Sequence, residues 1–157
     1  MPTDLNALRQ RFATLLVTET QLLDGFIAVL EEERTVLGHE NVEPLFDLAK
    51  KKSDIAFQLQ RLADSRITVL AQAGKPHSRA GIQALLAGQH AEIWNTYLNR
   101  AAQAKLLNEN NGKAVTQRLA SNHQALAVLL AHSDQPMTYG PDGASRPRLG
   151  SRHLGSV

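Results

Sequence analysis

Apolar residues recur at steps of three and four along most of the chain, and this spacing predicts long amphipathic helices. The pattern covers residues 4–37, 42–73 and 89–132, and a shorter stretch covers residues 79–87. The connection at 38–41 is short, so the first two helices should lie side by side and antiparallel. The predicted fold is all-α: an antiparallel, coiled-coil-like bundle of three long helices with a short extra helix.

The ends of the predicted helices carry residues that suit caps. Thr3 or Asp4 can cap the first helix, and Gly38 follows it where a left-handed C-terminal residue is expected. We expect Asn41 to cap the second long helix and Ser78 to cap the short one.

The third long helix must pass through "LNENNGKAV", whose asparagines and glycine are typical of a loop. The apolar phase is not reset there, and one glycine inside a helix costs only about 1 kcal/mol. We therefore predict a continuous helix through Gly112. Asn108, Asn111 and Asn122 would then lie on its buried face, where they pair with polar groups across the bundle and fix its register, or form a polar ligand site. The predicted buried stripe also includes Ile93, Tyr97, Ala101, Ala104, Val115, Leu119, Leu126 and Leu129.

The helical pattern ends near His132. Pro136, Pro141, Pro147 and four glycines follow, and they exclude helix from most of the remainder. The expected organisation is a helical bundle domain over residues 1–132 and a flexible tail over residues 133–157.

Two charge runs face each other across the predicted hairpin. "EEER" occupies residues 31–34 and "KKK" residues 50–52. We interpret them as a solvated face with exposed ion pairs, each worth about 0.2–1 kcal/mol. A charged docking patch is the alternative.

Neither the motifs nor the composition indicates an enzyme. The chain has no cysteine, and its six histidines form no H-x-x-x-H or E-x-x-H pair. Phosphate-binding and nucleophile-elbow motifs are missing. The formal charge is only +2 and the basic residues are not interleaved with aromatics, so we expect no nucleic-acid partner. No cofactor or metal is expected.

The first residues contain no apolar core of a signal peptide, and no continuous run of 18 apolar residues occurs. We therefore expect a cytoplasmic protein that is not inserted in a membrane. The lack of cysteine fits a reducing compartment.

Some apolar residues of the third long helix lie off its buried stripe. Leu98, Leu106 and Val128 point away from it. They either form a second strip that binds a partner, or are ordinary surface residues.

Several stretches together resemble the FlgN-type flagellar export chaperones. They are "LLDGFIAVLEEERTVL", "LFDLAKKKSDIAFQLQRL", "LNENNGKAVTQRL" and the ending "YGPDG…SRHLGSV". The resemblance implies a helical chaperone of type III export that binds the amphipathic C-terminal segment of hook–filament junction proteins. Such a chaperone prevents premature self-association of its client and delivers it to the export gate. The alternative is a generic helical adaptor or coiled-coil scaffold, whose surplus apolar residues would serve self-association.

The resemblance also assigns a role to one tail residue. In this family a tyrosine just after the last long helix docks onto the cytoplasmic domain of an export-gate membrane protein, and Tyr139 matches that position. A tyrosine suits an anchor because it offers a large apolar face and a hydroxyl. Alternatively, Tyr139 packs back on the end of the helix.

Overall fold

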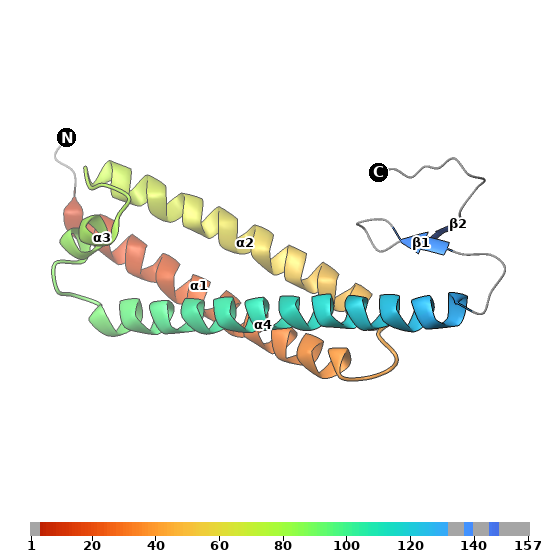
Figure 1. Ribbon diagram of the computed structural model, residues 1–157. Helices are drawn as coiled ribbons and strands as arrows, with labels where there is room; N and C mark the ends of the chain where they lie inside the picture. The colour runs from red at the N-terminus through yellow and green to blue at the C-terminus, as the bar shows by residue number, and fades with distance from the viewer. Residues whose placement is uncertain (1–3, 132–136, 140–144, 148–157) are drawn as a thin grey trace. The chain divides into compact units, whose positions relative to one another are not determined.

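The computed structural model describes residues 4–131, 137–139 and 145–147. In this part of the chain it has four helices, α1 (Leu5–Leu37), α2 (Leu45–Gln72), α3 (Arg79–Leu86) and α4 (Ala91–Leu130) (Figure 1). The all-α prediction is confirmed, and so is the uninterrupted passage of α4 through Gly112. The chain forms two compact units, residues 1–111 and 112–157, whose boundary falls within α4.

Two of the expected caps are confirmed and two are wrong. The carboxylate of Asp4 accepts hydrogen bonds from the first turn of α1, and the hydroxyl of Ser78 accepts one from the N–H of Gly81. Gly38 has a φ of −83° rather than a left-handed conformation. Asn41 lies before α2, whose cap position is Pro44, and its side chain instead stabilises the preceding turn.

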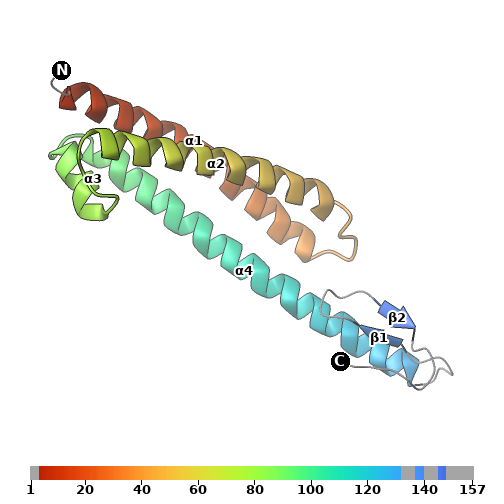
Figure 2. The ribbon, with the colours of Figure 1, turned by 90° about the horizontal axis from the view of Figure 1, so that it is seen from above.

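The three long helices of the first unit alternate in direction, and Figure 2 shows α1 and α2 lying alongside each other. One core cluster joins Phe12 and Leu16 of α1 to Val69 and Leu70 of α2, with Tyr97 of α4 packed against it. A second cluster joins the later part of α1 to Ala104. The first half of α1 packs near the start of α4, and the later part of α1 packs farther along α4. The two helices therefore run parallel, and both are antiparallel to α2. Each fully buried Leu, Val or Phe contributes about 1.5–3 kcal/mol to this core.

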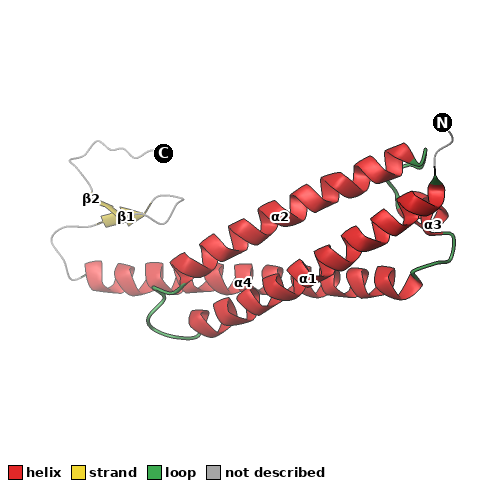
Figure 3. Ribbon diagram, turned by 180° about the vertical axis from the view of Figure 1, so that it is seen from behind, coloured by secondary structure: helices red, strands yellow, loops and turns green. Residues whose placement is uncertain are grey.

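The short helix α3 closes the end of the bundle where α1 begins and α2 ends (Figure 3). Ile82, Leu85 and Leu86 are buried there. Gly81 is required by a close approach, because a Cβ atom at this position would lie 1.9 Å from the carbonyl oxygen of Pro76. Gly81 therefore allows α3 to pack tightly on the loop that precedes it.

By length and composition, α1 could cross a membrane, since it contains an 18-residue window with a mean hydropathy of 1.4. This window contains polar residues, so it is not the continuous apolar run that the sequence was found to lack. In the bundle, Leu16, Leu23 and Leu30 of α1 are buried in the core. The apolar surface of α1 is thus used for packing between helices.

The described residues after α4 form two short strands, β1 (Met137–Tyr139) and β2 (Ser145–Pro147). They pair antiparallel, with Tyr139 opposite Ser145. The sequence pattern predicted no strand here. The expected boundary at 132–133 and the rest of the predicted flexible tail lie outside the described residues.

Candidate binding surfaces

The predicted buried stripe of α4 is confirmed in part as far as Asn111, whereas Asn108 and Asn122, which were expected on the buried face, are exposed. Tyr97 and Ala101 pack against the core, and Ala104 and Asn111 are buried. Asn111 is 2% exposed, and its amide donates to the main-chain oxygen of Leu30 and to Oε1 of Glu33. The prediction that an asparagine pairs across the bundle is therefore confirmed.

Beyond Asn111, the predicted burial is wrong. None of the described residues from 112 to 131 is buried. Val115, Leu119 and Leu129 are 39%, 47% and 68% exposed, and we call these three residues the α4 strip. The same periodicity that packs the first part of α4 thus presents apolar side chains to solvent in the second unit.

The three residues predicted to bind a client differ in exposure. Leu106 is 59% exposed and Val128 is 66% exposed, so both are available to a partner. Leu98 is half-buried. Their assignment to a client remains a prediction.

Tyr139 is the last residue of β1, and its main chain pairs with Ser145 of β2. The placement of its side chain lies outside the described residues. Neither its docking role nor its packing on the end of α4 is therefore tested here.

The opposed charge runs are only partly solvated. Nζ of Lys52 lies 3.2 Å from Glu33, whose side chain is 11% exposed. Lys52 also donates to the side-chain oxygen of Asn108 at 2.9 Å. These residues and Asn111 form a polar cluster where α1, α2 and α4 meet, whereas Lys50 and Lys51 are exposed.

Sequence reasoning missed a buried ion pair within the first core cluster. Nε of Arg66 lies 2.5 Å from Oε2 of Glu19, and the two side chains are 10% and 2% exposed. Arg66 also donates to the hydroxyl of Tyr97, and its guanidinium carbon lies 5.1 Å from the centre of that ring. Glu19 lies between Leu16 and Leu23 on the apolar face of α1. A charged residue at such a position indicates a buried partner of opposite charge, and this was the feature of the sequence that could have predicted the pair.

Burial governs the acidity of this network. Removal from water raises the pKa of Glu19 above its ordinary value of 4.5, while the hydrogen bond and charge of Arg66 oppose the shift. Burial likewise raises the pKa of Tyr97. The positive charge of Arg66 opposes this shift, and the negative charge of Glu19 adds to it. Through the ion pair with Glu19 and the hydrogen bond to Tyr97, Arg66 of α2 contacts both α1 and α4, and these contacts favour one arrangement of the three helices.

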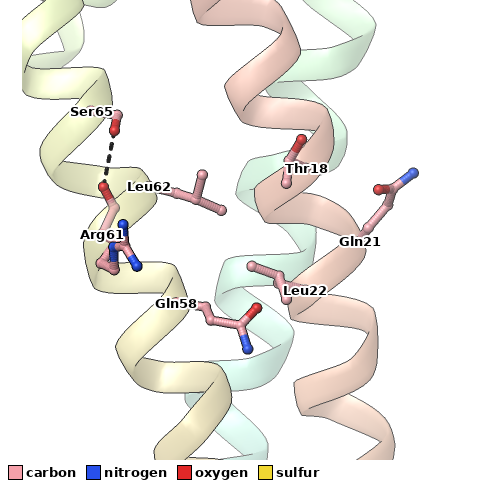
Figure 4. Close-up of a pocket in the computed structure, with 7 residues that line it drawn as sticks. All are labelled: Thr18, Gln21, Leu22, Gln58, Arg61, Leu62 and Ser65. Carbon is pink, nitrogen blue, oxygen red and sulfur yellow. Dashed lines mark hydrogen bonds between the residues drawn. The ribbon is translucent and has the colours of Figure 1, made fainter.

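A groove of about 460 Å³ lies between α1 and α2 (Figure 4). Leu22 and Leu62 extend into the gap between the two helices, and Arg61 is the charged residue of its lining. The remaining lining residues are Thr18, Gln21, Gln58 and Ser65. Among the described residues, no group of three or more His, Cys, Asp or Glu side chains could hold a metal ion.

Comparison with known proteins decides the family. Residues 1–147 match the family described as FlgN protein.

The chain belongs to the FlgN family.

The flagella synthesis protein FlgN of Yersinia enterocolitica is 28% identical over 139 residues, which cover 87% of this chain and 90% of that protein. The protein of the same name from Yersinia enterocolitica serotype O:8 / biotype 1B (strain NCTC 13174 / 8081) matches with the same identity and coverage. No solved structure matches the chain.

The FlgN match includes all four helices and both short strands, and it ends at Pro147 with the end of β2. The α4 strip and Tyr139 thus lie inside the FlgN region. Family membership, with relatives named for flagella synthesis, supports a role in flagellum assembly.

Proposed function

We propose that this FlgN-family protein is a cytoplasmic type III flagellar export chaperone. It binds the amphipathic C-terminal segment of hook–filament junction proteins, prevents their premature self-association and delivers them to the export gate. The observation that carries this proposal is the exposed α4 strip in a chain that matches the FlgN family over residues 1–147.

The α4 strip suits an amphipathic client helix. Val115, Leu119 and Leu129 are spaced so that a regular helix places them within one arc of about 80°. An amphipathic helix can lay its apolar face along such an arc, as helical ligands do in other complexes. Leu106 and Val128 are also exposed, but a regular helix places them on the other side of α4, about 180° and about 140° from Val115, and Leu98 is half-buried.

Release is as necessary to an export chaperone as binding. A few partly exposed aliphatic side chains give a contact of modest area, which is typical of complexes that dissociate. The exposure of the α4 strip therefore fits a client that is held temporarily.

Calorimetric titration with a purified hook–filament junction protein tests the client role. Leu119→Asp and Leu129→Asp should each weaken binding at least about tenfold, because a charge would be placed in the apolar contact of the α4 strip. The matched control is Gln117→Asp, which adds the same charge at an exposed polar position of α4. No binding by the unmodified protein, or equal binding by all three variants, would contradict the client role.

Tyr139 is the proposed contact with the cytoplasmic domain of the export-gate membrane protein. Tyr139→Ala should reduce affinity for that domain and leave client affinity and the melting temperature unchanged. Thr138→Ala in the same strand is the control. Packing of the ring on the helix end predicts a different result, namely a lower melting temperature and loss of both interactions.

A further inference from the structure

A second apolar surface lies on α2, on the side of the helix away from the core. Phe46 is 80% exposed and Phe57 is 66% exposed, so two of the four phenylalanines in the chain lie at the surface. Residues 46 and 57 are three turns apart, and a regular helix places them within about 20° of each other. Leu48, Val69 and Leu70 of the same helix are buried and face the bundle.

Charged residues surround Phe57 in a symmetric order. Lys50 precedes it by seven residues and Asp64 follows it by seven, so both lie within about 20° of its direction. Asp54 and Arg61 flank it on one side of the helix, at about 60° and 40°. All five side chains are exposed. None of the four charged residues forms an ion pair with another residue in the described part of the chain.

We propose that this face of α2 binds a second copy of the chain, with a two-fold axis passing beside Phe57. In two antiparallel helices related by such an axis, a residue before Phe57 faces the residue equally far after it in the other copy. Lys50 then faces Asp64 of the second copy, and Asp54 lies beside Arg61. Each pair occurs twice, around two phenylalanines that contact each other.

Charge complementarity selects the second copy and the register. A foreign partner would have to carry the same alternation of charges in reverse order, and a second α2 already does. Centring the axis between Phe46 and Phe57 would instead place Lys50 opposite Ser53 and leave Asp64 without a facing residue. With the axis at Phe57, Lys50 faces Asp64 and Arg61 lies within one residue of facing Asp54, so both cations of this face are near an anion of the second copy.

The surface is separate from the α4 strip, and the proposal does not depend on a flagellar client. One helix face offers less area than the roughly 800 Å² per partner of a standard interface, so the association should depend on protein concentration. Substitutions that place like charges opposite each other in this α2–α2 contact should weaken the association.

Sedimentation equilibrium across a range of concentrations tests the pairing. The 17.2 kDa chain should approach twice its mass as concentration rises. Lys50→Asp and Asp64→Lys should each raise the dissociation constant roughly 100-fold, since each variant sets like charges opposite each other. The double variant exchanges the partners and should restore the original value. A chain that stays monomeric, or a double variant no tighter than the single ones, would overturn the proposal.

Crosslinking through introduced cysteines tests the register, because the natural chain has none. Phe57→Cys should form a disulfide between copies, whereas Phe46→Cys should not, because its two copies would be about 33 Å apart along the helices. Both variants replace an exposed phenylalanine of the same face, so each serves as the control for the other. Crosslinking is measured at concentrations at which sedimentation shows each variant to be dimeric. Faster crosslinking at position 46 than at position 57 would overturn the proposed axis.

Discussion

The side-chain amide of Asn111 lies 2.8 Å from the carbonyl oxygen of Leu30 and 2.9 Å from Oε1 of Glu33. One side chain of α4 thereby satisfies two buried acceptors at the end of α1. It is also the last buried residue of α4 in the described structure. The sequence places it directly before Gly112, where the two compact units meet.

Replacing Asn111 by leucine should lower the free energy of unfolding by about 1–3 kcal/mol, because the Leu30 carbonyl loses its side-chain donor and Glu33 retains only Lys52. Urea denaturation followed by circular dichroism measures the change. The matched control is Asn122→Leu, at an exposed position of the same helix, which should change stability by less than about 0.5 kcal/mol. Equal effects at both positions would contradict the role assigned to Asn111.

Two glycines should respond to alanine in opposite directions. No atom lies within 4 Å of a Cβ at Gly112, so Gly112→Ala should stabilise the protein by about 0.5–1 kcal/mol through helix propensity alone. Gly81→Ala should destabilise it, because the added Cβ would overlap the carbonyl of Pro76. Thermal unfolding of the two variants provides the comparison, and a stabilised Gly81→Ala variant would refute the close approach.

Aspartate substitutions should separate Leu98 from Leu106. Leu98 is half-buried, so Leu98→Asp should lower stability by about 1–3 kcal/mol and thus lower the melting temperature. Leu106 is 59% exposed, and Leu106→Asp should remain within about 0.5 kcal/mol of the unmodified protein. Under the proposed function, only the second variant gives a clean test of client binding. Unfolding of Leu106→Asp would show that Leu106 belongs to the core.

The buried carboxyl of Glu19 predicts a pH dependence of stability. Its pKa is raised in the folded protein, chiefly by burial, so the folded state holds the proton more tightly than the unfolded state. The stability contributed by this proton is fully present below pH 4.5 and is lost as the pH rises through the raised value. Glu19→Gln cannot ionise. The stability of the unmodified protein minus that of Glu19→Gln should therefore fall with rising pH, as chemical denaturation at a series of pH values can measure. A difference that grows with pH would have the wrong sign.

Much of the fold follows from the sequence because helix periodicity depends on local spacing. The predicted helices differ from the observed ones by only a few residues at each end, and the "LNENNGKAV" segment is helical as its phase required. The prediction of a left-handed conformation for Gly38 was wrong. The main-chain N–H of Gly38 donates to the carbonyl oxygens of Thr35 and Val36 while the residue keeps a right-handed helical conformation. The conformation at a helix C-terminus depends on local backbone geometry that residue type alone does not determine.

Burial was less predictable than secondary structure. The stripe from Ile93 to Leu129 has one continuous period, but a period does not show where the facing helices cease to cover it. The pairing of Glu19 with Arg66 depends on contacts between helices distant in sequence. Phe46 and Phe57 lie off the buried stripe of α2, and single exposed apolar residues are common on protein surfaces, so their positions alone predict no surface role.

The α4 strip also has a thermodynamic consequence. A partner that covers Val115, Leu119 and Leu129 removes apolar surface from water, and such burial carries a negative change in heat capacity. The enthalpy of complex formation should then become more favourable on warming. Hydrophobic association of this kind weakens on cooling, so a complex formed through the strip should loosen in the cold before the bundle core does.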